Sequence, residues 1–238
     1  MGSALRSLLF YILFVLWTLL WAIVLLPFPL LAQRWRFWGC GTWARVGSSI
    51  FTATLGLRIH VTGLENLPRG PCVIVSNHQS ALETLLLWRY FPRLAFVLKG
   101  ELLRLPIIGW YLPLSAPIAI DRRAGRQALK QVLEQGEQRL RDGIPVLLFP
   151  EGTRQPCGQI GEFHQTAAAL AQRVGVPILP LALNSGCFWP RGEWRKRGGE
   201  LHLHFGPSMA AAGRSAEITA QLREWIAAEV QRMPPHSG

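Results

Sequence analysis

An uncharged apolar run near the N-terminus constrains this chain more than any other feature. Leu8 to Leu26 is a 19-residue run without a charged side chain, rich in Leu, Ile, Phe and Trp. A helix of about 20 such residues is long enough to cross the apolar core of a bilayer. Pro27-Phe28-Pro29 follows, where a cleaved signal peptide would carry small residues. The run therefore predicts a membrane-attachment helix that remains part of the protein.

A second segment, from Leu30 to Leu57, contains three tryptophans and three arginines: Trp35, Trp38, Trp43, Arg34, Arg36 and Arg45. The two prolines before it are expected to end the first helix. Arginines flank the apolar run on both sides, so the positive-inside rule does not set an orientation. Two geometries satisfy the sequence: the first helix spans the membrane, or both segments form a hairpin in one leaflet. We expect attachment helices over 1–57, an α/β domain over 58–233 and a tail over 234–238.

The charge balance predicts an anionic partner. The net charge is +11, the pI is near 10.7, and hydrophobic residues make up 50% of the chain against 16% charged residues. Either a phospholipid surface or a nucleic acid would suit this balance. Part of the positive charge lies beside the apolar N-terminus, and no nucleic-acid-reading motif is present. We therefore expect an anionic phospholipid membrane as partner, and no nucleic acid.

Beyond residue 57, short apolar runs alternate with helical stretches. The predicted strands are Arg58–Val61, Cys72–Ser76, Ala95–Leu98, Ile118–Ile120, Val146–Phe149, Ile178–Leu183 and Leu201–Phe205. The predicted helices are Ser80–Tyr90, Gly125–Arg141, Thr166–Val174 and Ala216–Gln231. Strands rich in Val, Ile and Leu that alternate with helices indicate an α/β sheet with helices on its faces.

Cysteine and histidine spacing gives no sign of a metal site. The four cysteines, Cys40, Cys72, Cys157 and Cys187, form no C-x-x-C pair, and reduced thiols without structural zinc are expected. His202 and His204 alternate on a predicted strand and so share a face. With no acidic or cysteine partner assigned to them, we expect a structural role rather than metal ligation.

Three predicted strand-end loops carry polar residues that a fold alone does not require. They are Asn77–Ser80, Lys99–Leu102 and Phe149–Arg154. In open α/β sheets, ligands bind beyond the carboxyl ends of the strands, so these loops are expected to line one crevice. A fourth segment, Cys187–Arg197, mixes two tryptophans with four cations and suits either a membrane interface or a solvated basic loop.

Four motifs in one order resemble the glycerolipid acyltransferase family, specifically bacterial 1-acyl-sn-glycerol-3-phosphate acyltransferases. The motifs are N-H-x-S-x-x-[DE] at Asn77–Glu83, an echo of the second motif at Lys99–Leu102 with Ile120–Arg122, F-P-E-G-T-R at Phe149–Arg154, and V-P-I-x-P-[VL]-x-L-N at Val176–Asn184. The resemblance covers roughly residues 60–205. It implies an α/β fold with a glycerol-3-phosphate acyltransferase-like sheet flanked by helices and preceded by an apolar helix or helical hairpin.

This sequence departs from the family pattern at two positions. The first motif ends in Glu83 where many members carry Asp, which lengthens the carboxylate arm by one methylene. After the third motif many members continue with Phe-Lys, whereas here the pair is Phe163-His164. The first change keeps an acceptor for an imidazole, and the second weakens a cationic contact.

His78 and Glu83 are the predicted catalytic residues. Acyl transfer from a thioester needs a base for the acceptor hydroxyl, and an imidazole such as that of His78 suits this role. Glu83 would hold the imidazole in the required tautomer, as the acid does in hydrolase triads. Ser80 to Glu83 also matches the S-x-x-E capping box, so Glu83 has a purely structural interpretation as well. No G-x-S-x-G motif is present, which argues against a serine hydrolase.

Phosphate binding is predicted for Lys99 and Arg154, since both offer charge-assisted contacts to phosphate oxygens. The resemblance also assigns phosphate binding to the segment Glu151, Gly152, Thr153 and Arg154. Gly152 would permit close backbone approach, and Glu151 would orient Arg154. A surface turn with a salt bridge is the alternative for this segment. Arg122 is a further candidate contact.

The resemblance implies a membrane-bound enzyme that moves a fatty acyl group to the sn-2 hydroxyl of 1-acyl-glycerol-3-phosphate (lysophosphatidic acid). The donor would be acyl-CoA or acyl-carrier protein and the product phosphatidic acid, with no cofactor and no metal. The expected location is the inner membrane, with the catalytic domain on the cytoplasmic side. The alternatives are the same chemistry on another lysophospholipid or a lyso-ornithine lipid, or a non-catalytic lipid-binding protein.

Overall fold

Seven strands form one mixed sheet in the computed structural model, which describes residues 2–121 and 124–234. The strands are β1 (Leu57–Thr62), β2 (Val73–Ser76), β3 (Ala95–Lys99), β4 (Ile118–Ile120), β5 (Val146–Leu148), β6 (Ile178–Leu183) and β7 (Gly199–Phe205). Their order across the sheet is β1-β7-β6-β2-β5-β3-β4. All of these neighbours run parallel except β6 and β7, which are antiparallel. The predicted α/β class is confirmed.

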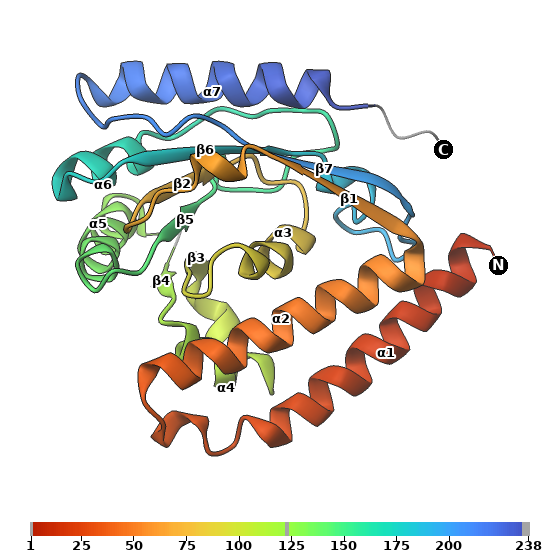
Figure 1. The fold of residues 1–238 in the computed structure, drawn as a ribbon. Helices are drawn as coiled ribbons and strands as arrows, with labels where there is room; N and C mark the ends of the chain where they lie inside the picture. Colours follow the sequence, from red (N-terminus) through yellow and green to blue (C-terminus); the bar gives the residue numbers. More distant parts are fainter. Residues whose placement is uncertain (1, 122–123, 235–238) are drawn as a thin grey trace.

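Helices cover both faces of the sheet (Figure 1). They are α1 (Ser3–Val24), α2 (Gln33–Leu55), α3 (Leu82–Leu86), α4 (Ile108–Tyr111), α5 (Arg126–Arg141), α6 (Thr166–Val174) and α7 (Ser215–Arg232). The 3₁₀ turns are η1 (Phe28–Leu30), η2 (Leu64–Asn66), η3 (Leu87–Arg89), η4 (Gly100–Arg104), η5 (Leu112–Ser115) and η7 (Ser185–Cys187). Helix α7 lies above the sheet in this view, whereas α3, α2 and α1 lie below it.

The burial of each strand follows from its place in the sheet. Every residue of β2, β5 and β6 is buried, which explains why the sequence shows these strands as continuous apolar runs. Strand β7 instead alternates: Leu201, Leu203 and Phe205 are buried on one face. His202 and His204 project from the other face because successive side chains of a strand point to opposite sides.

The N-terminal segment is a helical hairpin. Helices α1 and α2 pack side by side, joined by a turn that contains Pro27 and Pro29 (Figure 1). The Trp21 indole nitrogen donates to the carbonyl of Gly39 at 2.9 Å. A Cβ at Gly47 would lie 2.7 Å from the Phe14 ring, so the helices approach closely there. Helix α1 is long and apolar enough to cross a membrane, with a mean hydropathy of 2.4.

Each predicted strand, and three of the four helices predicted for the α/β domain, agree with a described element within about two residues, whereas α4 was not predicted. The helix expected over 80–90 is split into α3 and the 3₁₀ turn η3. It begins later because Ser80 lies before the helix, with its N–H bound to the Glu83 carboxylate. Arg122 and nearly all of the predicted tail lie outside the described residues.

The cysteine expectation is wrong for two of the four residues. Cys157 and Cys187 form a disulfide with a Cα–Cα distance of 5.0 Å, while Cys40 and Cys72 are free. The two bonded cysteines are 30 residues apart, so a search for C-x-x-C spacing does not find them. They meet because the loop after β5 folds against the turn after β6.

Candidate active site

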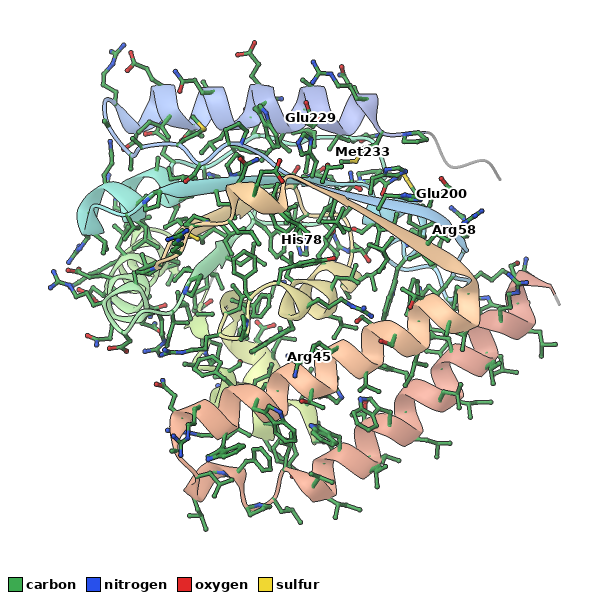
Figure 2. The ribbon with its side chains drawn as sticks, viewed as in Figure 1. Arg45, Arg58, His78, Glu200, Glu229 and Met233 are labelled. Atoms are coloured by element: carbon green, nitrogen blue, oxygen red, sulfur yellow. A yellow bond between two sulfur atoms is a disulfide. The ribbon has the colours of Figure 1, made fainter. Side chains whose placement is uncertain are left out.

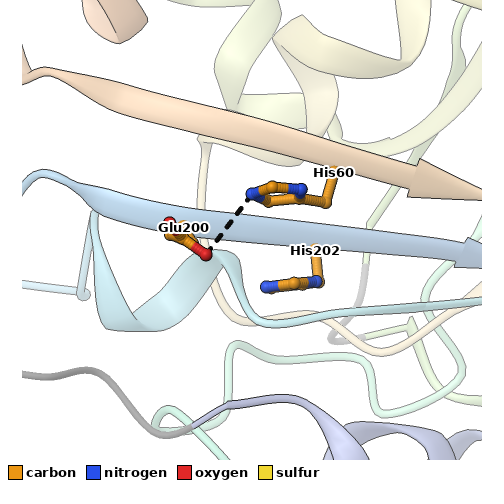
Figure 3. Close-up of side chains that lie close together, drawn as sticks. All are labelled: His60, Glu200 and His202. Atoms are coloured by element: carbon orange, nitrogen blue, oxygen red, sulfur yellow. Dashed lines mark ion pairs between the residues drawn. The ribbon is translucent and has the colours of Figure 1, made fainter.

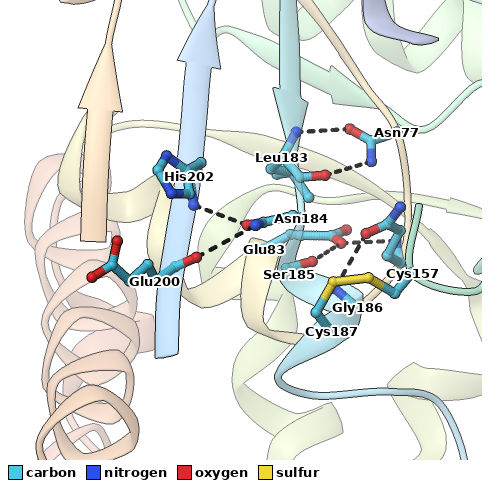
Figure 4. Close-up of a disulfide and its surroundings, with 11 residues drawn as sticks. Asn77, Glu83, Cys157, Leu183, Asn184, Ser185, Gly186, Cys187, Glu200 and His202 are labelled. Carbon is cyan, nitrogen blue, oxygen red and sulfur yellow. Dashed lines mark hydrogen bonds between the residues drawn. A yellow bond between two sulfur atoms is a disulfide. The ribbon is translucent and has the colours of Figure 1, made fainter. Parts of the chain in front are cut away.

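Four strand-end segments meet below the sheet and form the candidate site. Strand β2 lies between β5 and β6, so the loop that follows it contacts the loops that follow both neighbours. The Asn77 side chain fixes this arrangement. Its Nδ2 donates to the Leu183 carbonyl at 2.8 Å, and its Oδ1 accepts from the Leu183 N–H at 3.1 Å (Figure 4).

His78 and Glu83 are in contact, as predicted. The distance from His78 Nδ1 to Glu83 Oε2 is 2.6 Å. The His78 ring stacks on Phe149 with 3.9 Å between ring centroids, and its side chain is 13% exposed. Among the described residues, no hydrogen bond occupies Nε2 of His78. That nitrogen is therefore available to a substrate, while Nδ1 is held by Glu83.

Glu83 is fully buried and receives three further hydrogen bonds on Oε1. The backbone N–H groups of Gln79 and Ser80 donate at 2.8 and 2.7 Å. The Ser185 hydroxyl donates at 2.5 Å (Figure 4). The carboxylate thus bonds to Ser80 N–H as in a capping box, although Ser80 Oγ accepts from Leu82 rather than from Glu83. Capping and histidine contact are consequently two roles of one side chain, one for each oxygen.

Glu151 supports His78 through the backbone. Its Oε2 accepts the His78 N–H at 2.7 Å, and its Oε1 accepts the Gly161 N–H at 2.9 Å. Burial raises the pKa of Glu151, and these two N–H donors oppose that rise. The prediction that Glu151 orients Arg154 is wrong, since no ion pair joins them within the described ranges. The Glu151 carboxylate is buried, and both of its oxygens accept backbone N–H groups, one of them from the loop that carries His78.

A cavity of about 500 Å³ opens beside His78. The N-terminal hairpin and the α/β domain both contribute to its apolar wall, which includes Trp21, Leu25, Trp43, Leu85, Trp88, Phe96 and Phe149. Its polar lining includes His78, Lys99, Thr153, Arg154 and Arg191. His78 lies between the sheet and α2, on the side where the hairpin covers the domain (Figure 2). A volume of this size is typical of a small-molecule pocket.

The predicted substrate-binding residues fall into two groups. Lys99, Thr153 and Arg154 line the cavity, whereas Glu151 lies behind His78. Gly152 adopts φ +67°, a left-handed conformation that favours glycine and turns the chain between Glu151 and the cavity. Arg122 lies outside the described residues. Each of the three loops expected to line one crevice thus contributes to the cavity, with His78, Lys99 and Arg154 among the lining residues.

Sequence reasoning missed two residues of the site. Ser185 directly follows the fourth motif, and that position was the available signal for it. Arg191 lines the cavity and its Nη1 donates to Thr153 Oγ1 at 3.3 Å, although its sequence context indicated only a membrane interface or basic loop. Both come from the segment after β6, which closes over the ends of β2 and β5.

The site combines a histidine bonded to a buried carboxylate with an apolar cavity that has cations at its rim. This combination suits the transfer of an acyl group to an alcohol. The Acyltransferase family model matches residues 58–184, which span all the strand ends of the site. The chain belongs to this acyltransferase family and is an enzyme of that class.

Its relatives narrow the class. The chain is 40% identical to a 1-acyl-sn-glycerol-3-phosphate acyltransferase of Pseudomonas aeruginosa, covering 98% of this chain and 93% of that protein. It is 33% identical to the chloroplastic enzyme BAT2 of the same name from Brassica napus, over 70% of this chain and 49% of that protein. The fold is similar to the crystal structure of the 1-acyl-sn-glycerophosphate acyltransferase PlsC from Thermotoga maritima, with a TM-score of 0.81, 25% identity and 98% of each chain covered.

Proposed function

We propose that this enzyme transfers a fatty acyl group from acyl-CoA or acyl-carrier protein to the sn-2 hydroxyl of lysophosphatidic acid, forming phosphatidic acid. The observation that carries the proposal is the His78–Glu83 pair at the wall of an apolar cavity with cations at its rim. The cavity suits an acyl chain and the cations suit a phosphate. The relatives named above support this choice of acceptor.

His78 acts as the general base. Its free Nε2 takes the proton of the sn-2 hydroxyl as that oxygen attacks the thioester carbonyl. The tetrahedral intermediate then collapses, the carbon–sulfur bond breaks, and the thiolate leaves with the proton that the imidazolium returns. Glu83 stabilises the imidazolium and keeps the neutral ring in the tautomer with its proton on Nδ1. The thioester is already activated, so no covalent acyl-enzyme is required.

Lys99, Arg154 and Arg191 bind the phosphate of the acceptor. A guanidinium offers paired N–H donors to phosphate oxygens, and an ammonium adds a mobile charge. The contact between Arg191 and Thr153 holds part of this rim in place. Arg122 is a further candidate from the sequence.

The substrate assignment is tested with purified protein, oleoyl-CoA or oleoyl-carrier protein, and a matched set of acceptors. We expect phosphatidic acid from lysophosphatidic acid and much slower acylation of lysophosphatidylcholine and monoacylglycerol. Arg154→Ala should raise KM for lysophosphatidic acid about tenfold or more, with little effect on monoacylglycerol. Arg214→Ala, a change of an exposed arginine outside the cavity, is the control. Absence of product with both donors and all acceptors would support the non-catalytic alternative.

For membrane attachment we propose that the α1–α2 hairpin enters one leaflet of the cytoplasmic membrane and keeps the catalytic domain on the cytoplasmic side. Helix α1 exposes large apolar side chains along its length, among them Leu16 at 58% and Ile23 at 66%. Helix α2 packs against both α1 and the α/β domain. A transmembrane α1 would draw α2 and the polar domain into the bilayer, which favours the shallow hairpin.

The topology is tested by labelling single cysteines introduced beside Arg6 and Arg34 from outside intact cells, in a chain whose two free cysteines are replaced by Cys40→Ser and Cys72→Ala. We expect that neither site reacts, because both lie on the cytoplasmic side of the bilayer. If the site beside Arg34 reacts and the site beside Arg6 does not, α1 spans the membrane and the hairpin proposal fails.

A further inference from the structure

Two histidines and a glutamate gather on strands β1 and β7 (Figure 3). They lie on the face of the sheet where His204 bonds to Glu229 of α7, and none of them lines the catalytic cavity. His60 on the edge strand β1 is the register partner of His202 on β7, and Glu200 lies two residues before His202. Alternation along the strands places all three side chains on one face. The expectation that His202 has no acidic neighbour is therefore wrong.

Their spacing is close to that of a metal centre. One ligand atom from each residue lies within 4.8 Å of the other two. His60 Nε2 and Glu200 Oε2 are 3.4 Å apart, and the imidazole rings stack with 4.8 Å between centroids. Ligands of a tetrahedral Zn²⁺ lie about 3.4 Å from each other, given metal–ligand bonds of about 2.1 Å. His60 Nε2 and Glu200 Oε2 already have that separation, and metal binding requires the His202 nitrogen to approach them to the same distance.

His202 supplies an independent observation that points to a ligand. Its Nε2 is shielded from solvent and has no hydrogen-bond partner in the described part of the chain. A buried polar atom left without a partner is costly.

The backbone that carries these ligands is held by a buried side chain. Asn184 Oδ1 accepts the His202 N–H at 2.9 Å, and Asn184 Nδ2 donates to the Glu200 carbonyl at 3.4 Å (Figure 4). Supporting contacts of this kind fix the ligand positions before an ion binds. The site is thus partly organised by the strand pair itself.

We propose that His60, Glu200 and His202 bind a divalent transition-metal ion of the Zn²⁺ type, with water in the fourth position. Two imidazoles and one carboxylate are ligands that suit such an ion. Strand β1 directly follows α2 and has β7 as its neighbour, so the ion ties the strand that leaves the helical hairpin to the rest of the sheet. The role is structural, since the three side chains lie outside the catalytic cavity.

Arg58 provides a way to test the metal site without removing a ligand. Its Nη2 lies 3.3 Å from Glu200 Oε1, while Oε2 of the same carboxylate faces His60. The arginine leaves the metal-facing oxygen free, but its positive charge opposes a nearby cation. Removing that charge should therefore strengthen metal binding, in contrast to the removal of a ligand.

The test is calorimetric titration of the metal-stripped, detergent-solubilised full chain with Zn²⁺, together with the visible absorption spectrum after Co²⁺ addition. We expect one ion per chain at micromolar affinity or better, and d–d bands typical of four-coordinate Co²⁺. His60→Asn and His202→Asn should each weaken binding about tenfold or more. Arg58→Gln should strengthen it about two- to fivefold. His164→Asn, which changes an exposed histidine elsewhere, should leave affinity unchanged.

Folding of each variant is checked by its circular dichroism spectrum and Tm, so that a loss of binding is not a loss of structure. Zn²⁺ should also raise the Tm of the native chain and fail to raise that of the two histidine variants. Binding only at millimolar Zn²⁺, or binding that the His60 and His202 changes leave untouched, shows an adventitious ion and overturns the proposal.

Discussion

Within the described residues, the pairs His78–Glu83 and His204–Glu229 have almost identical geometry and very different surroundings. His78 Nδ1 lies 2.6 Å from Glu83 Oε2, and His204 Nδ1 lies 2.7 Å from Glu229 Oε2. The first pair joins a strand-end loop to the helix that follows it. The second pair joins β7 to α7 on the opposite face of the sheet.

The two pairs differ in the other contacts of the carboxylate and in the surroundings of the imidazole ring. Glu83 is fully buried, its other oxygen accepts three neutral donors, and His78 is the ionisable side chain bonded to it in the described part of the chain. Glu229 also bonds to Arg232, and its histidine lies against the Trp225 ring. His78 of the first pair also lines the apolar cavity. A histidine–glutamate contact thus defines a candidate catalytic site only together with a binding space.

The largest expected contrast is between the two histidines. His78→Ala should lower kcat/KM by about 10³- to 10⁴-fold, since it removes the proposed base. His204→Ala should keep activity within about twofold and lower stability by about 1 kcal/mol. Acyl-transfer assays and thermal unfolding of both variants measure the contrast. Equal activity losses would mean that the two pairs do not differ in role.

The glutamates extend the same contrast. Glu83→Gln preserves size and one acceptor oxygen, but its amide nitrogen cannot hold the required tautomer of His78. We expect a loss of about 10²- to 10³-fold in kcat with the fold intact. Glu229→Gln, the matched control, should retain nearly full activity. A fully active Glu83→Gln enzyme would reduce Glu83 to its capping role.

Ser185 is expected to give a smaller effect through Glu83. Ser185→Ala removes one charge-assisted hydrogen bond from a buried carboxylate and should lower kcat about tenfold with KM nearly unchanged. Ser185→Thr keeps the hydroxyl and should restore most of the activity. Ser215→Ala, which removes a hydroxyl bonded to Gln172, serves as the control. A change in KM alone would place Ser185 in substrate binding instead.

The disulfide should have the smallest effect on activity and a clear effect on stability. It closes a loop of 30 residues between the segment after Arg154 and the turn that carries Ser185. Its removal by Cys157→Ala and Cys187→Ala should lower the unfolding free energy by about 3–4 kcal/mol and kcat by only a few-fold. Dithiothreitol should destabilise the native chain and leave the double variant unaffected. Equal responses of the two proteins would argue that the bond is absent in solution.

The fold was accessible from the sequence because its signals are local. Apolar runs marked the central strands, the helical pattern over 125–141 identified α5, and the two prolines marked the turn of the hairpin. The contact between His78 and Glu83 was also predictable, since both residues belong to one short motif. The capping pattern placed His78 before the helix, within reach of the carboxylate.

The features that were missed depend on contacts between distant segments. Ser185 reaches Glu83 across 102 positions, and Glu151 contacts His78 across 73. Cys157 meets Cys187, and His60 meets His202, only because strands from different parts of the chain become neighbours. The spacing of residues along the sequence does not show which distant segments become neighbours. These contacts could therefore be identified only from the folded structure.

The cavity wall is formed by both the N-terminal hairpin and the α/β domain, and this limits how the chain can be truncated. A boundary at residue 57 separates apolar helices from a polar domain by composition, but Trp21, Leu25 and Trp43 lie on one side of it and line the same cavity as His78. Phe37 and Ala44 of α2 also belong to the buried core that includes β2. A fragment starting at residue 58 would therefore lack part of the cavity wall and expose apolar side chains that α2 normally covers. A soluble version of this enzyme has to keep the hairpin and replace the exposed apolar side chains on its outer surface.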